Sequence, residues 1–254
     1  MRSRAKSAVA LCEGGKKTVM ILAIIMTLSF TAFAADEDEP KVRKVALTFD
    51  DGPSAKYTPQ ILDILKKNEV KATFFVLGKC VKLNPDVLRR AYAEGHFIGN
   101  HTYHHVRISD LVGSKEKIKE LVKEIKSAEK IIKETICGDD PNCEFEPPKF
   151  MRPPYGAKNK KSKEIVKSLG YKMVLWNVSS NDCEAVSHKL GWKAIFKSIF
   201  DAKRKRRNKE IVLMHDSGGN RTYDVQALPQ IITKYKKLGY EFVTVDGFYT
   251  AKED

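Results

Sequence analysis

Internal repeats and low-complexity tracts are absent after residue 34, which excludes a solenoid or a largely disordered chain. Cysteine is scarce, with five residues, and no two of them form the C-x-x-C pair typical of structural zinc sites. The apolar run of residues 19–30 is shorter than the roughly 20 residues that cross a bilayer. What remains is a chain of 254 residues, long enough to bury one substantial core, and we expect a single domain.

The N-terminus has the parts of a signal peptide. Basic residues precede the apolar run, and Ala32-Phe33-Ala34 after it has the small-x-small form of a cleavage site. We expect residues 1–34 to be a cleaved signal peptide, residues 35–43 a flexible segment and residues 44–254 the folded domain. A single-pass anchor is the alternative. Cleavage implies a secreted protein, periplasmic or associated with the cell wall, with no stable membrane anchor.

Basic residues outnumber acidic ones, and the net charge is +14. Five basic residues and one acidic residue lie within residues 1–34, so the chain after them has a net charge of +10. This charge favours an anionic partner such as a carboxylate-bearing wall polymer. The densest basic run, residues 203–207, has no interleaved aromatic residue, so we interpret it as a solvated helix end and expect no nucleic-acid partner.

Four cysteines follow the expected signal peptide, in a context that permits disulfides. The short spacing between Cys137 and Cys143 suggests a disulfide that closes the loop between them. Cys80 and Cys183 are then the other possible pair, or free thiols.

Short apolar runs alternate with segments of helical period, which is typical of repeated βα units and a parallel sheet. The expected strands are residues 45–49, 72–77, 97–100, 150–152, 172–177, 211–215 and 242–245. The expected helices are residues 59–67, 85–94, 114–135, 160–169, 192–204 and 225–238. Periodicity alone does not separate a closed barrel from an open doubly wound sheet, but both place a functional site at the carboxyl ends of the strands.

Polar side chains that can bind a metal follow two of these strands. Asp50 and Asp51 come directly after the first, where one carboxylate can bind a cation while its neighbour faces a substrate. His101 and His105 follow the third at a spacing that places both on one face of a helical turn, with His104 as a competing register. Each motif alone fits a solvated turn or loop. Together they predict a site of two imidazoles and one carboxylate, with positions open for water and substrate.

Three later strand ends add polar residues to the same rim. Arg152 is placed to hold a carboxylate in a bidentate pair, and Asp182 is a further carboxylate. His215 ends an apolar strand and is of the residue type best suited to donate a proton near neutral pH. A surface arginine, a turn-forming aspartate and a buried structural histidine are the respective alternatives.

Four motifs occur in order along the chain: Thr-Phe-Asp-Asp-Gly-Pro, His-Thr-x-x-His, Arg-Pro-Pro-Tyr-Gly and Leu-Met-His-Asp. This ordered set resembles the polysaccharide deacetylase family, the NodB-homology carbohydrate esterases of family 4, from about Val45 to Val245. The resemblance implies an α/β fold, a distorted (β/α)7 barrel of one domain. It also implies a metal-dependent hydrolase that removes acetyl groups from amino sugars.

The resemblance assigns a role to each matching residue. By it, Asp51, His101 and His105 bind a divalent metal, most often zinc, with cobalt or another divalent ion also used. Asp50 is the implied base, Arg152 orients it, His215 is the implied acid and Asp182 supports that histidine. The implied substrate-binding residues are Tyr155, Pro154 and Leu213.

Within this family we predict a monomeric deacetylase of N-acetylglucosamine in peptidoglycan, because the peptide carboxylates of that polymer suit a basic protein. Deacetylation of chitin oligosaccharides is the alternative, and a carbohydrate-binding pseudoenzyme is a third hypothesis. One motif departs from the family pattern Asp-x-x-Asp-Trp. Ser179 and Cys183 replace its first aspartate and its tryptophan, so one wall of the groove loses an indole surface.

Overall fold

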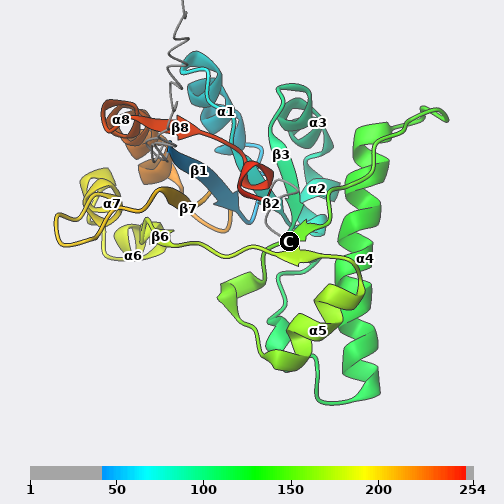
Figure 1. The fold of residues 1–254 in the computed structure, drawn as a ribbon. Helices are drawn as coiled ribbons and strands as arrows, with labels where there is room; N and C mark the ends of the chain where they lie inside the picture. The colour runs from blue at the N-terminus through cyan, green and yellow to red at the C-terminus, as the bar shows by residue number, and fades with distance from the viewer. Residues whose placement is uncertain (1–41, 250–254) are drawn as a thin grey trace, which may run out of the picture. The chain divides into compact units, whose positions relative to one another are not determined.

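The computed structural model describes residues 42–249 (Figure 1). The expected signal peptide, and all but the last two residues of the expected flexible segment 35–43, lie outside the described residues. The first strand begins at Arg43, one residue before the expected start of the domain. Within the described range, no helix combines the length and apolar character needed to cross a bilayer.

The described chain forms one curled parallel sheet. Its order is β5-β4-β3-β2-β1-β7-β6, and β8 pairs with the first residues of β1. Every strand pair is parallel. The strands are β1 (Arg43–Asp50), β2 (Thr73–Val76), β3 (Phe97–Asn100), β4 (Phe150–Met151), β5 (Lys172–Met173), β6 (Val178–Ser179), β7 (Lys209–His215) and β8 (Tyr240–Phe242).

Helices surround this sheet, and together they make the distorted (β/α)7 barrel that the motifs predict (Figure 1). The α-helices are α1 (Thr58–Lys67), α2 (Gly78–Leu83), α3 (Pro85–Ala93), α4 (Lys115–Cys137), α5 (Lys160–Ser168), α6 (Asp182–Ser187), α7 (Trp192–Ile199) and α8 (Thr222–Lys237). Short 3-10 helices are η1 (Ile108–Asp110), η2 (Pro154–Gly156) and η3 (Val245–Phe248).

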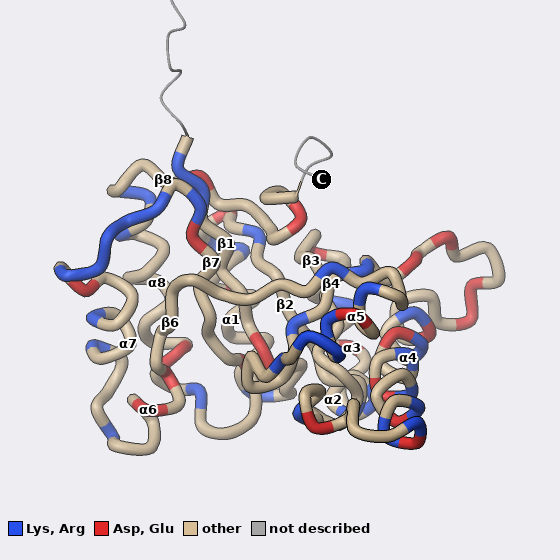
Figure 2. The backbone as a smooth tube through the Cα atoms, turned by 60° about the horizontal axis from the view of Figure 1, so that its bottom comes forward, with Lys and Arg blue, Asp and Glu red and all other residues tan. Residues whose placement is uncertain are grey.

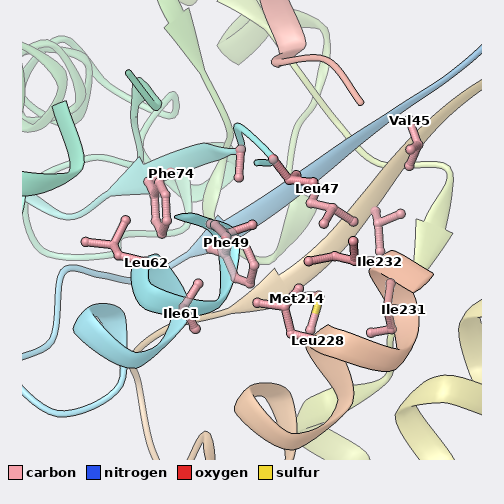
Figure 3. Packing of buried hydrophobic residues seen from close by; sticks show 14 of the residues in the cluster. Val45, Leu47, Phe49, Ile61, Leu62, Phe74, Met214, Leu228, Ile231 and Ile232 are labelled. Carbon is pink, nitrogen blue, oxygen red and sulfur yellow. The ribbon is translucent and has the colours of Figure 1, made fainter. Parts of the chain in front are cut away.

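Successive side chains of β1 point alternately to the hydrophobic core and to the interior of the barrel, where the candidate site lies. Val45, Leu47 and Phe49 are fully buried in the cluster that includes residues of α1 and α8 (Figure 3). Burial of each such side chain contributes about 1.5–3 kcal/mol. Because successive side chains of a strand point to opposite faces, Thr48 and Asp50 point to the other face of the sheet, into the barrel.

Several element boundaries differ from the sequence predictions. Of the expected strand 172–177, only Lys172–Met173 (β5) is a strand, and β6 (Val178–Ser179) begins just after its expected end. The last strand is Tyr240–Phe242, earlier than the expected 242–245, and the two six-residue helices α2 and α6 were not predicted. Short helices carry too few residues to show a hydrophobic period.

The basic run also differs from its prediction, because α7 ends at Ile199 and the run lies in the turn that follows. Arg204 donates from both Nη atoms to the two carboxylate oxygens of Glu210, each at 2.9 Å. Arg206 adds a contact of 3.5 Å to the same carboxylate. Two of the five basic residues therefore form a structural ion cluster rather than a solvated helix end.

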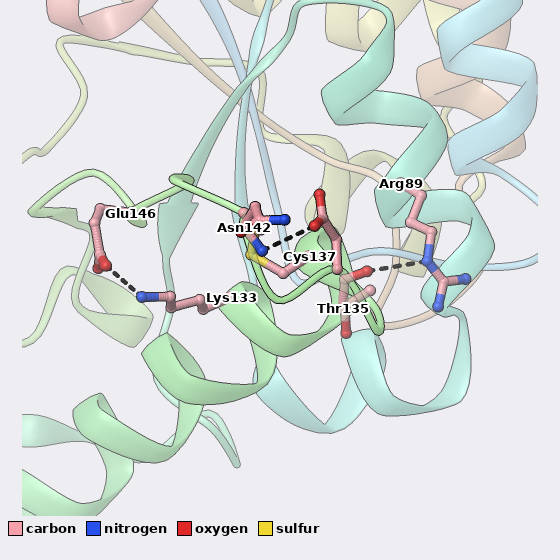
Figure 4. The surroundings of a disulfide bond; sticks show 8 residues. Arg89, Lys133, Thr135, Cys137, Asn142 and Glu146 are labelled. Carbon is pink, nitrogen blue, oxygen red and sulfur yellow. Dashed lines mark hydrogen bonds and ion pairs between the residues drawn. A yellow bond between two sulfur atoms is a disulfide. The ribbon is translucent and has the colours of Figure 1, made fainter.

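A disulfide joins Cys137 at the end of α4 to Cys143, and it closes the loop that the cysteine spacing predicts (Figure 4). Lys133 pairs with Glu146 beside it, and Arg89 donates to the Thr135 carbonyl at 3.0 Å. Cys80 and Cys183 are free thiols. The second disulfide that the spacing allowed is therefore not formed.

Candidate active site and metal centre

Two adjacent carboxylates at the end of β1 point in different directions. Asp50 is buried in the barrel, where its Oδ1 accepts from Arg152 Nη1 at 2.8 Å. Asp51 leaves the strand with a left-handed φ of 76°. Its Oδ1 lies 3.5 Å from Nε2 of His101 and 3.2 Å from Nε2 of His105.

The two histidines converge, but not through a helical turn as expected. His101 directly follows β3, and no helix is assigned from His101 to His105. Thr102 and His105 have left-handed φ values of 70° and 68°. The Thr102 hydroxyl accepts from the His105 N–H at 3.1 Å and braces this loop. Backbone geometry of the loop, not helical period, therefore brings the imidazoles together.

One hydrogen bond fixes the tautomer of His101. Its Nδ1 lies 2.7 Å from the carbonyl oxygen of Arg152. A carbonyl only accepts, so Nδ1 carries the proton and the lone pair of Nε2 faces Asp51. Orientation of a ligand histidine by a backbone carbonyl is common at metal sites.

The competing register at His104 is wrong. Its ring is largely exposed, and its Nδ1 pairs with Glu124 Oε1 at 2.6 Å. The ligand atoms of Asp51, His101 and His105 all lie within 4.8 Å of one another, and His104 is not among them.

The donor set of Asp51, His101 and His105 fits a divalent cation. Asp51 Oδ1 is buried and has no hydrogen-bond partner among the described residues. Burial raises the pKa of Asp51, but His101, His215 and His105 outweigh it and lower the pKa to about 2. The pKa of His105 is lowered, chiefly by burial. Metal binding requires an ionised carboxylate and unprotonated imidazole nitrogens, and the lowered pKa values of Asp51 and His105 favour these states.

Arg152 holds the neighbouring Asp50. Its side chain is fully buried, and Nη1 donates to Asp50 Oδ1 and, at 2.7 Å, to Thr48 Oγ1. The guanidinium lies over the Phe75 ring, 4.2 Å from its centroid. The contact with Asp50 uses one nitrogen, so the expected bidentate pair is not formed.

On the other side of Asp50, β7 ends in His215, which is opposite Asp50 in the strand register. His215 Nδ1 lies 2.8 Å from Oδ2 of Asp182, a buried carboxylate at the start of α6. Burial lowers the pKa of His215, but the hydrogen bond and charge of Asp182 outweigh it and raise the pKa to about 11. Burial alone would raise the pKa of Asp182, yet His215 and Arg221 hold it well below its usual range. His215 is therefore an imidazolium that can donate a proton.

Two residues of this region were not assigned a role from the sequence. Arg221 is buried, and its Nη1 lies 3.7 Å from Asp182 Oδ2 and 3.5 Å from Cys183 Sγ. Asp216 is buried and accepts from Thr58 Oγ1 at 2.6 Å. A Cβ on Gly52 would lie 2.1 Å from Asp216 Oδ2, which explains the glycine in this turn. Asp216 belongs to the Leu-Met-His-Asp motif, whereas no sequence signal marks Arg221.

The residues expected to contact a substrate have different environments. Tyr155 is exposed, and its ring lies 4.5 Å from that of His105. Pro154 beside it is buried. Leu213 is almost buried and lies on the same face of β7 as His215. Cys183 is exposed, with Sγ 3.9 Å from His215 Nδ1, where the expected indole surface is missing.

Known proteins are similar to this chain. Residues 37–174 match the family model described as polysaccharide deacetylase. A relative in Bacillus cereus, named peptidoglycan-N-acetylglucosamine deacetylase, is 36% identical over 202 residues, which are 79% of this chain and 85% of that protein. A relative in Listeria monocytogenes, named peptidoglycan-N-acetylglucosamine deacetylase PgdA, is 36% identical over 210 residues. The match covers 83% of this chain but only 40% of that protein.

A further relative and a solved structure are also similar to this chain. The Bacillus subtilis protein named peptidoglycan-N-acetylmuramic acid deacetylase PdaA is 32% identical over 84% of this chain and 74% of its own length. The crystal structure of the Bc1960 peptidoglycan N-acetylglucosamine deacetylase superposes with a TM-score of 0.70 at 33% identity, covering 84% of this chain and 91% of that one. The chain therefore belongs to the polysaccharide deacetylase family, the NodB-like carbohydrate esterases of family 4.

Proposed function

We propose that this chain is a metal-dependent deacetylase that hydrolyses the N-acetyl groups of N-acetylglucosamine in peptidoglycan and releases acetate. One observation carries the proposal. Asp50, held by Arg152, and His215, held by Asp182, stand on neighbouring strands beside the Asp51, His101 and His105 cluster. A base, an acid and a metal-binding set therefore share one rim, as amide hydrolysis requires.

The chain's own residues divide the proton transfers. Asp51, His101 and His105 would hold a divalent ion, which would polarise the amide carbonyl and lower the pKa of the attacking water. Asp50 accepts the proton of the attacking water, and Arg152 keeps this carboxylate oriented. His215 donates its proton to the departing amine nitrogen, and Asp182 holds its ring in place. No side chain becomes covalently attached to the substrate.

Zinc is the metal we propose, because two imidazoles and one carboxylate are a frequent catalytic zinc set. Cobalt or another divalent ion suits the same donors. The ligands are Asp51, His101 and His105, and the roles of Asp50 and Asp51 are not interchangeable. Only Asp51 faces both imidazoles within 3.5 Å through one oxygen.

Peptidoglycan is the proposed substrate for two reasons. The relatives described above are named as peptidoglycan deacetylases, and N-acetylglucosamine is the sugar in most of those names. The chain after residue 34 has a net charge of +10, which suits a polymer with peptide carboxylates. We further propose that residues 1–34 direct export and that the monomeric domain acts at the cell wall.

Acetate release from purified peptidoglycan and from chitin oligosaccharides, each with and without a chelator, tests this function. We expect faster release from peptidoglycan, loss of release with the chelator and recovery with zinc. Faster release from chitin oligosaccharides would contradict the proposed substrate and identify chitin oligosaccharides as the preferred one. No release from either substrate by the zinc-loaded protein would identify a carbohydrate-binding pseudoenzyme instead.

A further inference from the structure

Two adjoining hollows lie beside Tyr155. The first, about 280 Å³, is lined by Tyr155, Gly156, Lys158, Leu175 and Trp176. The second, about 660 Å³, is lined by residues of α5, of β5 and of the chain next to them. Lys158 and Leu175 border both hollows, so the two adjoin each other and are together called the α5 groove.

The α5 groove begins at the wall of the catalytic site. Tyr155 lines its first hollow, and the same ring lies 4.5 Å from the ring of the proposed metal ligand His105. Arg107 lies over the Tyr155 ring at 4.7 Å and adds a positive charge there. A polymer bound with one sugar at the metal centre can therefore place a substituent of a neighbouring sugar in this groove.

Every charged residue that lines the α5 groove is a lysine. These residues are Lys158, Lys163, Lys167 and Lys172. Among residues 42–249, no carboxylate forms an ion pair with Lys158, Lys163 or Lys167, which leaves three exposed ammonium groups for an external anion. Figure 2 shows basic positions gathered at α5 and the chain beside it.

The floor between these lysines is apolar. Met173, Leu175 and Trp176 are only partly buried there, and Val166 lies beneath the lysines of α5. A rim of cations over an apolar floor suits a ligand that carries both carboxylates and aliphatic side chains.

We propose that the α5 groove binds the acidic peptide stem of peptidoglycan while the adjoining sugar is deacetylated. The stem is a short peptide with free carboxylates, attached to the sugar next to N-acetylglucosamine, so it matches the groove in charge and in apolar content. This inference rests on the proposed function. It adds a peptide subsite that makes stem-bearing strands better substrates than bare strands.

The test uses glycan strands with stems, the same strands after an amidase has removed the stems, and uncharged N-acetylglucosamine oligomers. The test variant is Lys158→Gln/Lys163→Gln/Lys167→Gln. The control is Lys115→Gln/Lys117→Gln/Lys119→Gln, which removes three exposed charges from the start of α4. Steady-state acetate release gives KM and kcat for each combination of protein and substrate.

For the native chain we expect a lower KM for stem-bearing strands than for bare strands. The groove variant should raise KM for stem-bearing strands about tenfold, since three exposed charge contacts together supply about 1.4 kcal/mol. Its kcat, and its KM for bare strands and oligomers, should stay unchanged, and the control should behave like the native chain. Added salt should reduce the difference in KM between stem-bearing and bare strands for the native chain, because salt screens charge interactions at the surface.

Equal KM values for stem-bearing and bare strands in the native chain would overturn the inference and leave the proposed function intact. An equal loss in the control variant would also overturn it, because net charge rather than the groove would then explain the effect. Failure to release acetate from all three substrates would instead refute the proposed function.

Discussion

Nδ1 of His215 lies 2.8 Å from Oδ2 of Asp182, and this pair gives the histidine a proton that it keeps far above neutral pH. The two residues come from β7 and α6, 33 positions apart in the sequence. Because Asp182 is buried, its charge acts on His215 with little screening by water.

Asp182→Asn should move the alkaline limb of activity to lower pH. Asparagine keeps the shape of Asp182 but removes the charge that raises the pKa of His215 to about 11. Because the pKa of His215 in the folded chain is above its ordinary value of 6.5, the protonated histidine also stabilises the fold. This stabilisation is fully present below pH 6.5 and is lost as the pH rises towards 11. Profiles of kcat/KM against pH, with an NMR titration of His215, measure the shift. Glu184→Gln, an exposed change in α6, is the control. An unmoved limb would show that Asp182 does not govern this proton.

His215→Asn should impair amide hydrolysis by about 10²–10⁴-fold, the usual contribution of a general acid. Nitrophenolate is a leaving group that departs without being protonated. The hydrolysis of an acetyl ester of nitrophenol should therefore fall much less than the hydrolysis of the amide. Rates of acetate release from both substrates give the comparison. Equal losses on the amide and the ester would contradict the acid role.

The two free thiols should differ in reactivity. The pKa of Cys183 is lowered, first by its hydrogen bond with His215 and also by Arg221, whereas burial raises the pKa of Cys80. Iodoacetamide at neutral pH should therefore modify Cys183 first, and activity should fall as it does so, because Sγ lies 3.9 Å from His215. Mass spectrometry of the native chain, Cys183→Ser and Cys80→Ser follows both events. Modification of Cys80 at the same rate would refute this expectation.

Glu210→Ala should destabilise the fold by about 3–5 kcal/mol, because it leaves the cluster around Arg204 without its anion. Burial alone would raise the pKa of Glu210, but Arg204 and Tyr235 outweigh it and lower the pKa. Its contribution is therefore present above the ordinary value of 4.5 and is lost as pH falls through the lowered pKa. Denaturant unfolding at several pH values measures the effect, and Glu241→Ala on the exposed side of β8 is the control. A change as small as that of the control would contradict the structural role of Glu210.

The apolar run 45–49 was enough to predict the strand β1 and the position of Asp50 at its end. The sequence also predicted that His101 and His105 converge, but it attributed this to a helical turn. The actual cause, left-handed φ values at Thr102 and His105, leaves no periodic signal because single residues in that region do not repeat.

Other features depend on contacts between distant segments, which a linear pattern does not contain. Arg221 approaches Asp182 from 39 positions away, and Arg204 folds back onto Glu210 instead of continuing α7. Arg152 contacts Asp50 through one nitrogen where two were expected, and the same Nη1 also donates to Thr48.

The metal content of Asp50→Asn and His105→Ala, measured beside acetate release, tests the central claim most directly. Asp50 is held by Arg152, whereas His105 Nε2 faces Asp51 Oδ1 at 3.2 Å, so only His105 belongs to the donor set. We predict that Asp50→Asn retains the native metal content and loses most turnover, while His105→Ala loses the metal together with turnover. Equal loss of metal in both variants would contradict the division of roles between Asp50 and Asp51.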